Sequence, residues 1–434
     1  MGPRPLSVRV FLLPLARIGI ARAYRVASAS WWQRASPGRK ILEGAGQMKL
    51  RNGLTVAGLV VATILMVGGL GLETGTAQDQ PKAPRPQYDF EKESIPGATV
   101  DEPVLKEFSL SKAAAYIEAG NKLWWKKRKC VACHTTGVFG VMRPSLSSYL
   151  GKPGPALRKF LVADLAKMKQ QKIEKLRTGV RPTQMAYLAG ALAEWDKHVT
   201  GKLSPETDEA LRLLLSLQSD DGSFNNIGCW PPFESSAYHG TTVAAKALES
   251  APGWLGGLKD SDLLARVAKT HNYLKTTKPP HDYGKLLLLW TSARVPGLVD
   301  AKQKQELIDL VLKHQQADGG WSIRTFATPE TWGDGSRAEK LKSEKDFKNP
   351  PSDGHQTGLV LLVLREAGMA AKDKRIQRGV NWLLKNQRQS GRWWTRSLNK
   401  DTYHYITFSG SCYPLLALGK CGVLPTKIQV SKAP

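Results

Sequence analysis

The sequence contains few cysteines and lacks the motifs of several large enzyme classes. Only five cysteines occur among 434 residues, too few for a disulfide scaffold in a chain of this length. Neither a phosphate-binding loop, a dinucleotide-binding glycine pattern nor a serine-nucleophile elbow is present. Strand-like alternation of apolar and polar residues is almost absent as well. The sequence therefore gives no support to nucleotide-dependent or serine-based chemistry.

Positive charge is in excess, but it forms no dense basic block. The 63 Lys and Arg residues outnumber the 37 Asp and Glu residues, which gives a net charge of +26. Ten of the basic residues and only one acid lie before or at Gly53, and the rest are spread along the chain. We therefore expect a solvated or membrane-facing surface and no nucleic-acid partner.

The N-terminal region carries an export signal. An apolar run, Gly53 to Leu72, follows the basic segment that begins at Met48 and precedes small residues that end at Ala77. This pattern is typical of a secretory signal cleaved after Ala77, and it is also long enough to anchor the protein in a membrane uncleaved. Both alternatives place the protein in the periplasm or cell envelope.

The segments that flank the main domain follow from the position of this signal. Because a signal should begin near the initiator methionine, we interpret residues 1–47 as an upstream extension. The region before the first helix is rich in proline and charge, and we expect an extended linker there. The predicted organisation is 1–47 extension, 48–77 signal or anchor, 78–108 linker, 109–425 helical domain and 426–434 tail.

The domain is predicted to be all-α, because apolar residues recur at helical spacing between Gly- and Pro-rich breaks. We expect twelve helices in six pairs: 110–129, 136–150, 155–177, 183–199, 206–218, 239–250, 260–277, 283–294, 302–315, 355–368, 374–387 and 408–420.

An internal repeat connects these helices. Three of them end in a glutamine that is followed by Gly four residues later and by an aromatic six residues later: Gln218, Gly222 and Phe224; Gln315, Gly319 and Trp321; and Gln387, Gly391 and Trp393. The next helix then starts with a polar residue that precedes a leucine by seven positions, as Thr357 precedes Leu364. We interpret the motif as a structural turn between antiparallel helices that must stack on neighbouring pairs.

The repeat resembles the QW motif of squalene-hopene cyclases and related terpenoid cyclases and prenyltransferases. The resemblance covers roughly residues 109–425 and implies an α/α toroid of about six helical hairpins. The segment from Gly228 to Ser235, with Tyr238-His-Gly after it, also looks like bacterial exported toroid proteins that carry a CxxCH motif near their start. The family's acid motif, Asp-x-Asp-Asp, is absent here. Asp353 is the only weak candidate for the proton donor.

Cys130, Cys133 and His134 form a CxxCH motif, the pattern that attaches haem c. The two thiols would bind the porphyrin vinyl groups and His134 would ligate the iron. In the repeat register, Arg128 takes the place of Gln387 and His134 that of Trp393, so the motif is a modified repeat turn. Of the other cysteines, Cys229 stands alone, and Cys412 and Cys421 are free thiols or, alternatively, a disulfide; we favour free thiols.

Four further histidines stand just before the second helix of a pair, as His134 does, and would share one rim of the toroid. They are either candidates for the sixth iron ligand or helix caps, and Met142 is a further ligand candidate: His239, His281, His355 and His404. An alternative zinc site would use Asp353, His355 and His404, in a faint resemblance to the zinc ligands of protein prenyltransferases. The interval 324–351 interrupts one repeat, and we favour a mobile charged loop over a cover for the cavity mouth.

Three functions remain open at this point. The first is an exported, membrane-associated toroid that carries one haem c and acts in redox chemistry, with a redox partner, or in binding an apolar lipid or isoprenoid. The second, implied by the resemblance, is a terpenoid cyclase or isomerase acting on a polyisoprenoid lipid. The third is a structural or interaction toroid without haem.

Overall fold

The computed structural model describes residues 85–224, 231–233 and 236–426, all within the compact unit Ala77–Pro434. Their regular secondary structure is almost entirely helical, as the sequence predicts. Six helices lie on the outside: α1 (Leu110–Arg128), α4 (Pro155–Lys169), α7 (Pro205–Ser216), α10 (Ser261–Thr276), α12 (Ala301–Lys313) and α15 (Lys374–Lys385). Six lie inside: α2 (Val138–Met142), α6 (Arg181–Trp195), α8 (Ala237–Ser250), α11 (Asp282–Ser292), α14 (Gly354–Glu366) and α16 (Ile406–Lys420).

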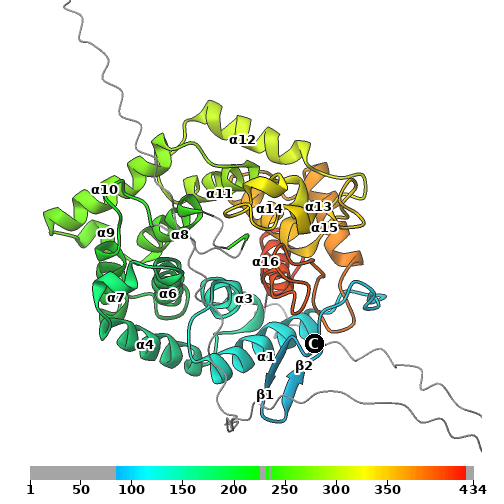
Figure 1. The fold of residues 1–434 in the computed structure, drawn as a ribbon, viewed down its shortest axis with the longest axis horizontal. Coiled ribbons are helices and arrows are strands. Elements are labelled where there is room, and N and C mark those ends of the chain that lie inside the picture. The colour runs from blue at the N-terminus through cyan, green and yellow to red at the C-terminus, as the bar shows by residue number, and fades with distance from the viewer. Residues whose placement is uncertain (1–84, 225–230, 234–235, 427–434) are drawn as a thin grey trace, which may run out of the picture. The chain divides into compact units, whose positions relative to one another are not determined.

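The inner helices form a closed ring. Each packs on the next, from α2 through α6, α8, α11, α14 and α16, and α16 packs back on α2 (Figure 1). Inner helices are apolar on nearly all sides; in α14 every residue from Gly354 to Leu364 is buried. Outer helices bury one stripe only, as α12 does with Leu307, Ile308, Val311 and Leu312. The expected fold, an α/α toroid of six helical hairpins, is confirmed.

Smaller elements complete the described residues. They are α3 (Ser147–Leu150), α5 (Ile173–Leu176), α9 (Trp254–Gly257), α13 (Ala338–Lys342), the strands β1 (Tyr88–Phe90) and β2 (Glu93–Ile95), and single turns at Cys133–Gly137, Pro144–Leu146, Asp196–Thr200, Ile323–Thr325 and Pro329–Thr331. The helix expected over 136–150 is therefore divided into α2, a 3₁₀ turn and α3. Pro144 accounts for the break, because it has no N–H to donate to the preceding turn. No helix of the described residues is long and apolar enough to cross a membrane.

Each Gln–Gly–aromatic turn ties one hairpin to the next. The amide of Gln315 donates to the carbonyl of Gly319 and to that of Arg375 in α15, both at 2.8 Å. Gly319 has a φ of 93°, and a Cβ there would lie 2.8 Å from the carbonyl oxygen of Arg378, so only glycine fits. The backbone N–H of buried Trp321 donates to Thr357 Oγ1 at 2.9 Å. These contacts give the motif a structural role.

The other two turns repeat this geometry. Gln218 donates to the Gly222 carbonyl and to Thr270 of α10, and the Phe224 N–H donates to Thr241. Gln387 donates to the carbonyls of Gly391 and Ser109, and the Trp393 N–H donates to Ser411. Because Ser109 is the N-cap of α1, the last turn of the repeat holds the first outer helix and closes the ring.

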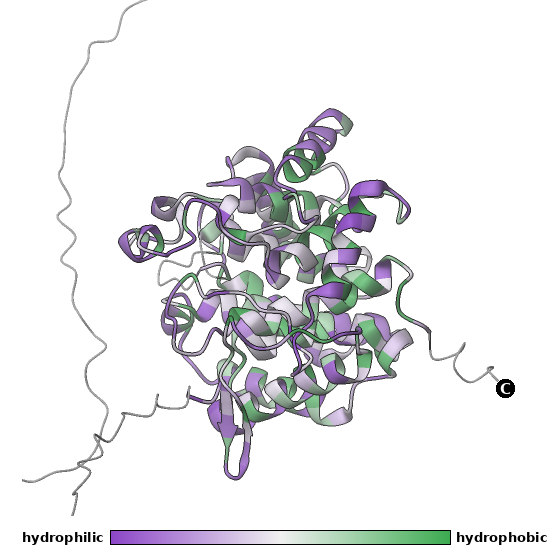
Figure 2. Ribbon diagram, turned by 90° about the vertical axis from the view of Figure 1, so that its right-hand side faces the viewer, coloured by the Kyte–Doolittle hydropathy of each residue, from purple (hydrophilic) through white to green (hydrophobic). Residues whose placement is uncertain are grey.

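The linker predicted over 78–108 is wrong for its described part, residues 85–108. β1 and β2 form an antiparallel hairpin that packs on α1, with a largely hydrophilic surface (Figure 2). Farther along, Glu102 pairs with Arg392 at 2.6 Å, and the Leu105 N–H donates to the Gln387 carbonyl at 2.7 Å. We call residues 85–108 the N-terminal strap. Its buried Tyr88 and Gln87 explain why a Pro-rich, charged segment is ordered here.

Candidate functional site

The CxxCH motif occupies the turn between α1 and α2. Lys129 ends α1 in the left-handed region, with a φ of 54°, and a π-helical turn starts at Cys133. Cys130 is partly buried, and burial together with the nearby Asp164 carboxylate raises the pKa of its thiol. Cys133 is buried and lies close enough to Tyr413 of α16 to contribute, after burial and Cys412, to the raised pKa of that phenol. The two thiols therefore have different surroundings, although they are three residues apart.

His134 is enclosed by aromatic rings. The Tyr405 ring stacks on the imidazole with centroids 4.7 Å apart, and Trp124 meets it edge-on, also at 4.7 Å. A hydrogen bond of 2.8 Å joins Nδ1 to Thr135 Oγ1, and burial lowers the pKa of His134 to about 3. Tyr405 and Trp124 therefore pack against the ring of His134. The motif holds two thiols and one imidazole in a single turn, which is the set of groups that attaches haem c.

Three of the histidines predicted as ligands lie at the N-terminal ends of inner helices. His239 and His355 are in the first turns of α8 and α14, and His281 is the N-cap of α11. All three surround Tyr283 at 6.1 Å between ring centroids, and we call these four residues the histidine end. His404 stands apart and packs on Trp394 at 4.6 Å.

Burial keeps the imidazoles of the histidine end neutral. It lowers the pKa values of His239 and His355 to about 3 and that of His281 to about 4. Tyr283 Oη and His355 Nε2 share a hydrogen bond of 3.2 Å, and His355 Nδ1 is bonded to Ser409 at 2.7 Å. The ring of His355 is therefore held from both sides by protein groups.

The predicted zinc ligands are engaged with the protein. Asp353 is the N-cap of α14; it accepts hydrogen bonds from the N–H groups of Gln356 and Ile323 and from Thr395 Oγ1. Burial raises its pKa to about 6. His404 Nδ1 accepts from the Ser397 N–H at 3.0 Å. Across the described part of the chain, no three His, Cys, Asp or Glu side chains are grouped to hold a metal ion.

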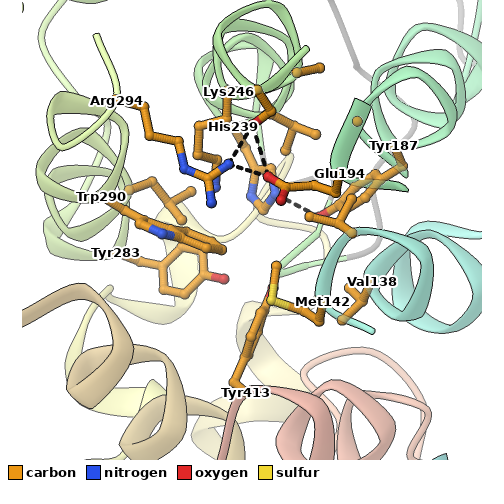
Figure 3. Close-up of a pocket in the computed structure, with 16 residues that line it drawn as sticks. Val138, Met142, Tyr187, Glu194, His239, Lys246, Tyr283, Trp290, Arg294 and Tyr413 are labelled. Atoms are coloured by element: carbon orange, nitrogen blue, oxygen red, sulfur yellow. Dashed lines mark hydrogen bonds and ion pairs between the residues drawn. The ribbon is translucent and has the colours of Figure 1, made fainter. Parts of the chain in front are cut away.

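A cavity lies at the centre of the ring (Figure 3). Side chains from five inner helices line it, and most are apolar or aromatic: Val138, Val141, Met142, Tyr187, Gly190, Val243, Ala247, Tyr283, Leu287, Trp290 and Tyr413. The polar lining residues are Glu194, His239, Lys246, Ser250 and Arg294. Met142, a ligand candidate for haem iron, thus faces this cavity, and Asp353 is not among the lining residues.

A cluster of buried and partly buried charges lies on the side of the cavity formed by the C-terminal ends of inner helices. Glu194 ends α6, Lys246 lies in the second half of α8, Arg294 follows α11, and Glu366 ends α14; we call these four residues the charged end. Glu194 is ion-paired with Arg294 and accepts a hydrogen bond from Ser250 at 2.8 Å. Arg294 also lies 4.0 Å from Glu366. Burial raises the pKa of Glu194, but Arg294 and His198 outweigh it and hold the pKa well below its usual value.

Lys246 enters the cavity without an acidic partner. Its Nζ lies 3.0 Å from the centroid of the Trp290 ring, and none of the ion pairs in the described residues includes it. Burial first, and then the charge of Arg294, lower the pKa of Lys246 well below its usual value. Sequence reasoning missed Lys246, Glu194 and Arg294. The sequence feature that could have identified them is a single charged residue within, or just after, a long apolar inner helix.

The insertion over 324–351 covers the histidine end. Trp332 is 1% exposed and packs on His281 at 4.9 Å and on Tyr283 at 5.4 Å between centroids. Arg324 anchors the other part of the insertion through Glu344 at 2.6 Å. The preference for a mobile charged loop is therefore wrong, because one tryptophan supplies enough apolar area to dock the segment.

The cysteines form no disulfide within the described residues. Cys412 and Cys421 are both buried free thiols, as favoured from the sequence, and Cys229 lies outside the described residues. The segment from Gly228 to Ser235 is described only at Pro231–Phe233.

Comparisons with known proteins agree with this architecture. Residues 283–422, from α11 through α16, match the family model of the squalene-hopene cyclase C-terminal domain. No curated protein sequence matches the chain. The closed ring of helical hairpins defines the class as an α/α toroid, and its second half is similar to the squalene-hopene cyclase C-terminal domain.

Two solved structures resemble the chain at low identity. The ent-copalyl diphosphate synthase from Streptomyces platensis is 15% identical, with a TM-score of 0.41; the match covers 66% of this chain and 50% of that one, so the chain spans about half its length. A variant of the type II terpene cyclase MstE from Scytonema, in complex with its substrate geranylgeranyl dihydroxybenzoate, is 13% identical, with a TM-score of 0.39, and covers 73% of this chain and 99% of that one.

Proposed function

We propose that the protein binds an apolar, isoprenoid-type molecule in the central cavity. The lining of the cavity carries this proposal, because most of its side chains are apolar or aromatic. A concave site of this kind, with a few polar groups among apolar ones, is typical of small-molecule sites. The family match supports the choice of ligand class, because its span supplies Tyr283, Leu287, Trp290 and Tyr413 to the lining.

The distribution of polar groups favours a ligand with a long hydrocarbon part. Tyr187, Tyr283, Trp290 and Tyr413 present aromatic surfaces to the cavity (Figure 3). The imidazoles of the histidine end are neutral, so charge within the cavity is confined to the charged end. A ligand with a hydrocarbon chain between the two ends buries no polar group in the apolar middle of the cavity, so none is left there without a hydrogen-bond partner.

Binding can be tested with farnesol, a neutral isoprenoid alcohol, by isothermal titration calorimetry. Gly190 lines the cavity, and a Cβ there meets its nearest neighbour at 3.4 Å, so Gly190→Leu adds bulk inside the cavity. We expect it to weaken binding by about tenfold or more, because overpacking costs roughly 1–3 kcal/mol. Gly256→Leu adds the same side chain to α9, where nothing lies within 4 Å, and is the matched control. Equal affinity in both variants, or no binding to the unaltered protein, would refute the proposal.

Cyclisation is the second candidate, and it rests on the family match at residues 283–422. Acid-initiated cyclisation needs a protonated carboxyl group beside the substrate. Glu194, the carboxylate in the cavity lining, is held ionised by Arg294, and the oxygens of Asp353 are engaged in capping α14. Asp353→Asn keeps an acceptor for the Gln356 N–H but loses the acceptor for the Ile323 N–H, so its melting temperature must show that it is folded. A loss of product formation from polyisoprenoid substrates in the folded variant would support the cyclase hypothesis, and unchanged products would remove its candidate acid.

Covalent haem is a separate proposal that rests on the sequence motif at Cys130, Cys133 and His134. Export and attachment to the cell envelope are also proposals. They rest on residues 48–77, which lie outside the described residues. When bound, haem supplies an iron centre for redox chemistry or ligand binding. A reduced absorption spectrum of protein purified from the periplasm tests the proposal. A sharp c-type band that disappears in Cys130→Ser/Cys133→Ser supports haem; its absence from the unaltered protein refutes it.

A further inference from the structure

Among the described residues Lys246 is the one lysine that lines the cavity, and its surroundings are unusual for a lysine. It is 8% exposed, and its Nζ lies over the face of Trp290, 3.0 Å from the ring centroid. Buried lysines are normally paired with carboxylates. In the described residues Lys246 forms neither an ion pair nor a hydrogen bond, although two carboxylates belong to the same charged end.

Arg294 explains why those carboxylates are not available to Lys246. Glu194 is ion-paired with Arg294 and also lies 3.1 Å from His198. Glu366 accepts from Trp290 Nε1 at 2.9 Å and lies within ion-pair distance of Arg294 and Lys420. Arg294 therefore satisfies both acids and adds a positive charge near Lys246.

The consequence for Lys246 is chemical. Burial and Arg294 both disfavour the ammonium form and lower the pKa of Lys246 well below its usual value, so the neutral amine is favoured more than in an exposed lysine. A neutral lysine amine in an apolar pocket is a nucleophile for carbonyl carbon. Its position in the cavity wall aims that nucleophile at the proposed ligand site (Figure 3).

We propose that Lys246 captures an apolar aldehyde or ketone of isoprenoid type as an imine within the central cavity. This inference rests on the proposed function and names the reactive group of its ligand. The Nζ lone pair forms a bond to the carbonyl carbon while one amine proton moves to the carbonyl oxygen. The second amine proton then leaves with that hydroxyl group as water, which breaks the C–O bond and forms C=N. No oxidant or reductant takes part.

Reductive trapping tests the imine. The full chain is incubated at pH 7 with one equivalent of farnesal, the aldehyde that corresponds to farnesol, and with sodium cyanoborohydride, which reduces imines to stable amines. We expect an intact mass that corresponds to one adduct, located at Lys246 by peptide mapping. Excess farnesol, which has the same hydrocarbon chain and no carbonyl group, should suppress it.

Three variants make the test specific. Lys246→Met keeps the length of the side chain and should lose the adduct, and Lys246→Arg, which retains charge but no primary amine, should lose it too. Lys285→Met removes a partly buried lysine of α11 that is paired with Asp282 at 2.9 Å, and it should leave the adduct unchanged. Melting temperatures confirm that each variant is folded, and the second Lys246 variant replaces the first if the methionine variant fails to fold.

The outcomes separate the imine from the binding proposal. An adduct that maps to Lys246 and disappears in its variants supports the inference. Equal labelling of Lys246→Met and the unaltered protein overturns it, since surface lysines would then account for the reaction. Farnesol binding without any adduct overturns the inference and leaves the proposed function standing. If neither compound binds, both fail.

Discussion

The two ends of the central cavity differ in charge although they are built from the same inner helices. The histidine end consists of neutral imidazoles and a phenol at the N-termini of α8, α11 and α14. The charged end consists of two acids and two basic side chains near the C-termini of α6, α8, α11 and α14. Since all hairpins in the ring run in the same sense, every inner helix presents the same pole to the same side.

Helix polarity accounts for the sign of this difference. The N-terminal end of a helix carries a partial positive charge and the C-terminal end a partial negative one. The N-terminal ends therefore disfavour protonated His239 and His355, and the C-terminal ends favour the Arg294 guanidinium. Burial amplifies both effects, because side chains in the ring interior have little water to screen them. The toroid thus separates a neutral polar end from a charged one without any additional element.

The largest effect is expected at the charged end. Glu194→Gln leaves the Arg294 charge buried without its main partner, and we expect a loss of about 3–5 kcal/mol in the free energy of unfolding. Urea denaturation measures it. The control is Glu209→Gln, which removes an exposed pair with Lys169 and should cost less than about 1 kcal/mol. Similar losses in the two variants would show that burial at the charged end does not matter.

The histidine end should respond to pH instead. The pKa of His355 in the folded protein is about 3, below the usual 6.5. The contribution of neutral His355 to the free energy of unfolding is therefore complete above pH 6.5 and is lost as the pH falls. The stability difference between the unaltered protein and His355→Gln should shrink by about 2–3 kcal/mol between pH 6.5 and 4.5. Denaturation at both pH values measures it. Glu194 has a lowered pKa, so its contribution is lost only below its ordinary pKa of about 4.5. A difference that stays constant would contradict a neutral, buried His355.

A smaller effect is expected for the hydroxyl group at the histidine end. Tyr283→Phe removes the hydrogen bond to His355 Nε2, and we expect a loss of about 1 kcal/mol. Thermal unfolding measures it. Tyr273→Phe is the control, because within the described residues the Tyr273 hydroxyl forms no hydrogen bond. A loss of the same size in the control would assign the effect to the ring and not to the bond.

The smallest effect is expected for Lys246. Lys246→Met replaces an unpaired buried amine with an apolar chain of similar length, so stability should stay within about 1 kcal/mol or rise. Denaturation under the conditions used for Glu194→Gln measures it. A loss in the free energy of unfolding as large as that of Glu194→Gln would indicate that Lys246 is a paired cation, and it would contradict a neutral amine.

Much of the fold could be predicted from periodicity and from the repeat. Every expected helical segment contains helix, because the apolar spacing reflects burial that every hairpin requires, but the segments 136–150 and 155–177 are each divided into shorter helices. The Gln, Gly and aromatic positions fixed the turns, since few other residues satisfy that geometry. The ordered strap could not be foreseen. Its stability depends on Arg392 and Gln387, almost 300 residues away along the chain.

The ligand site was harder to predict than the fold. The histidines drew attention through their shared place before inner helices, and three of them do meet at Tyr283. Lys246 and Glu194 were overlooked because one charge in a helix is usually solvated, and only the closed ring turns both toward the interior. The spacing of the CxxCH motif indicates haem, but it gave no sign that Trp124 and Tyr405 pack against His134.

Closure of the ring by the strap and by Gln387 has a consequence for biosynthesis. The partners of Ser109, Glu102 and Leu105 are all in the last hairpin, so none of these contacts can form until the ribosome has made α15 and the turn after it. Until then α1 lacks one of its neighbours, and its apolar stripe remains accessible. Contacts of such large sequence separation slow folding and expose intermediates to aggregation. We expect the nascent chain to need protection until synthesis of the domain is almost complete.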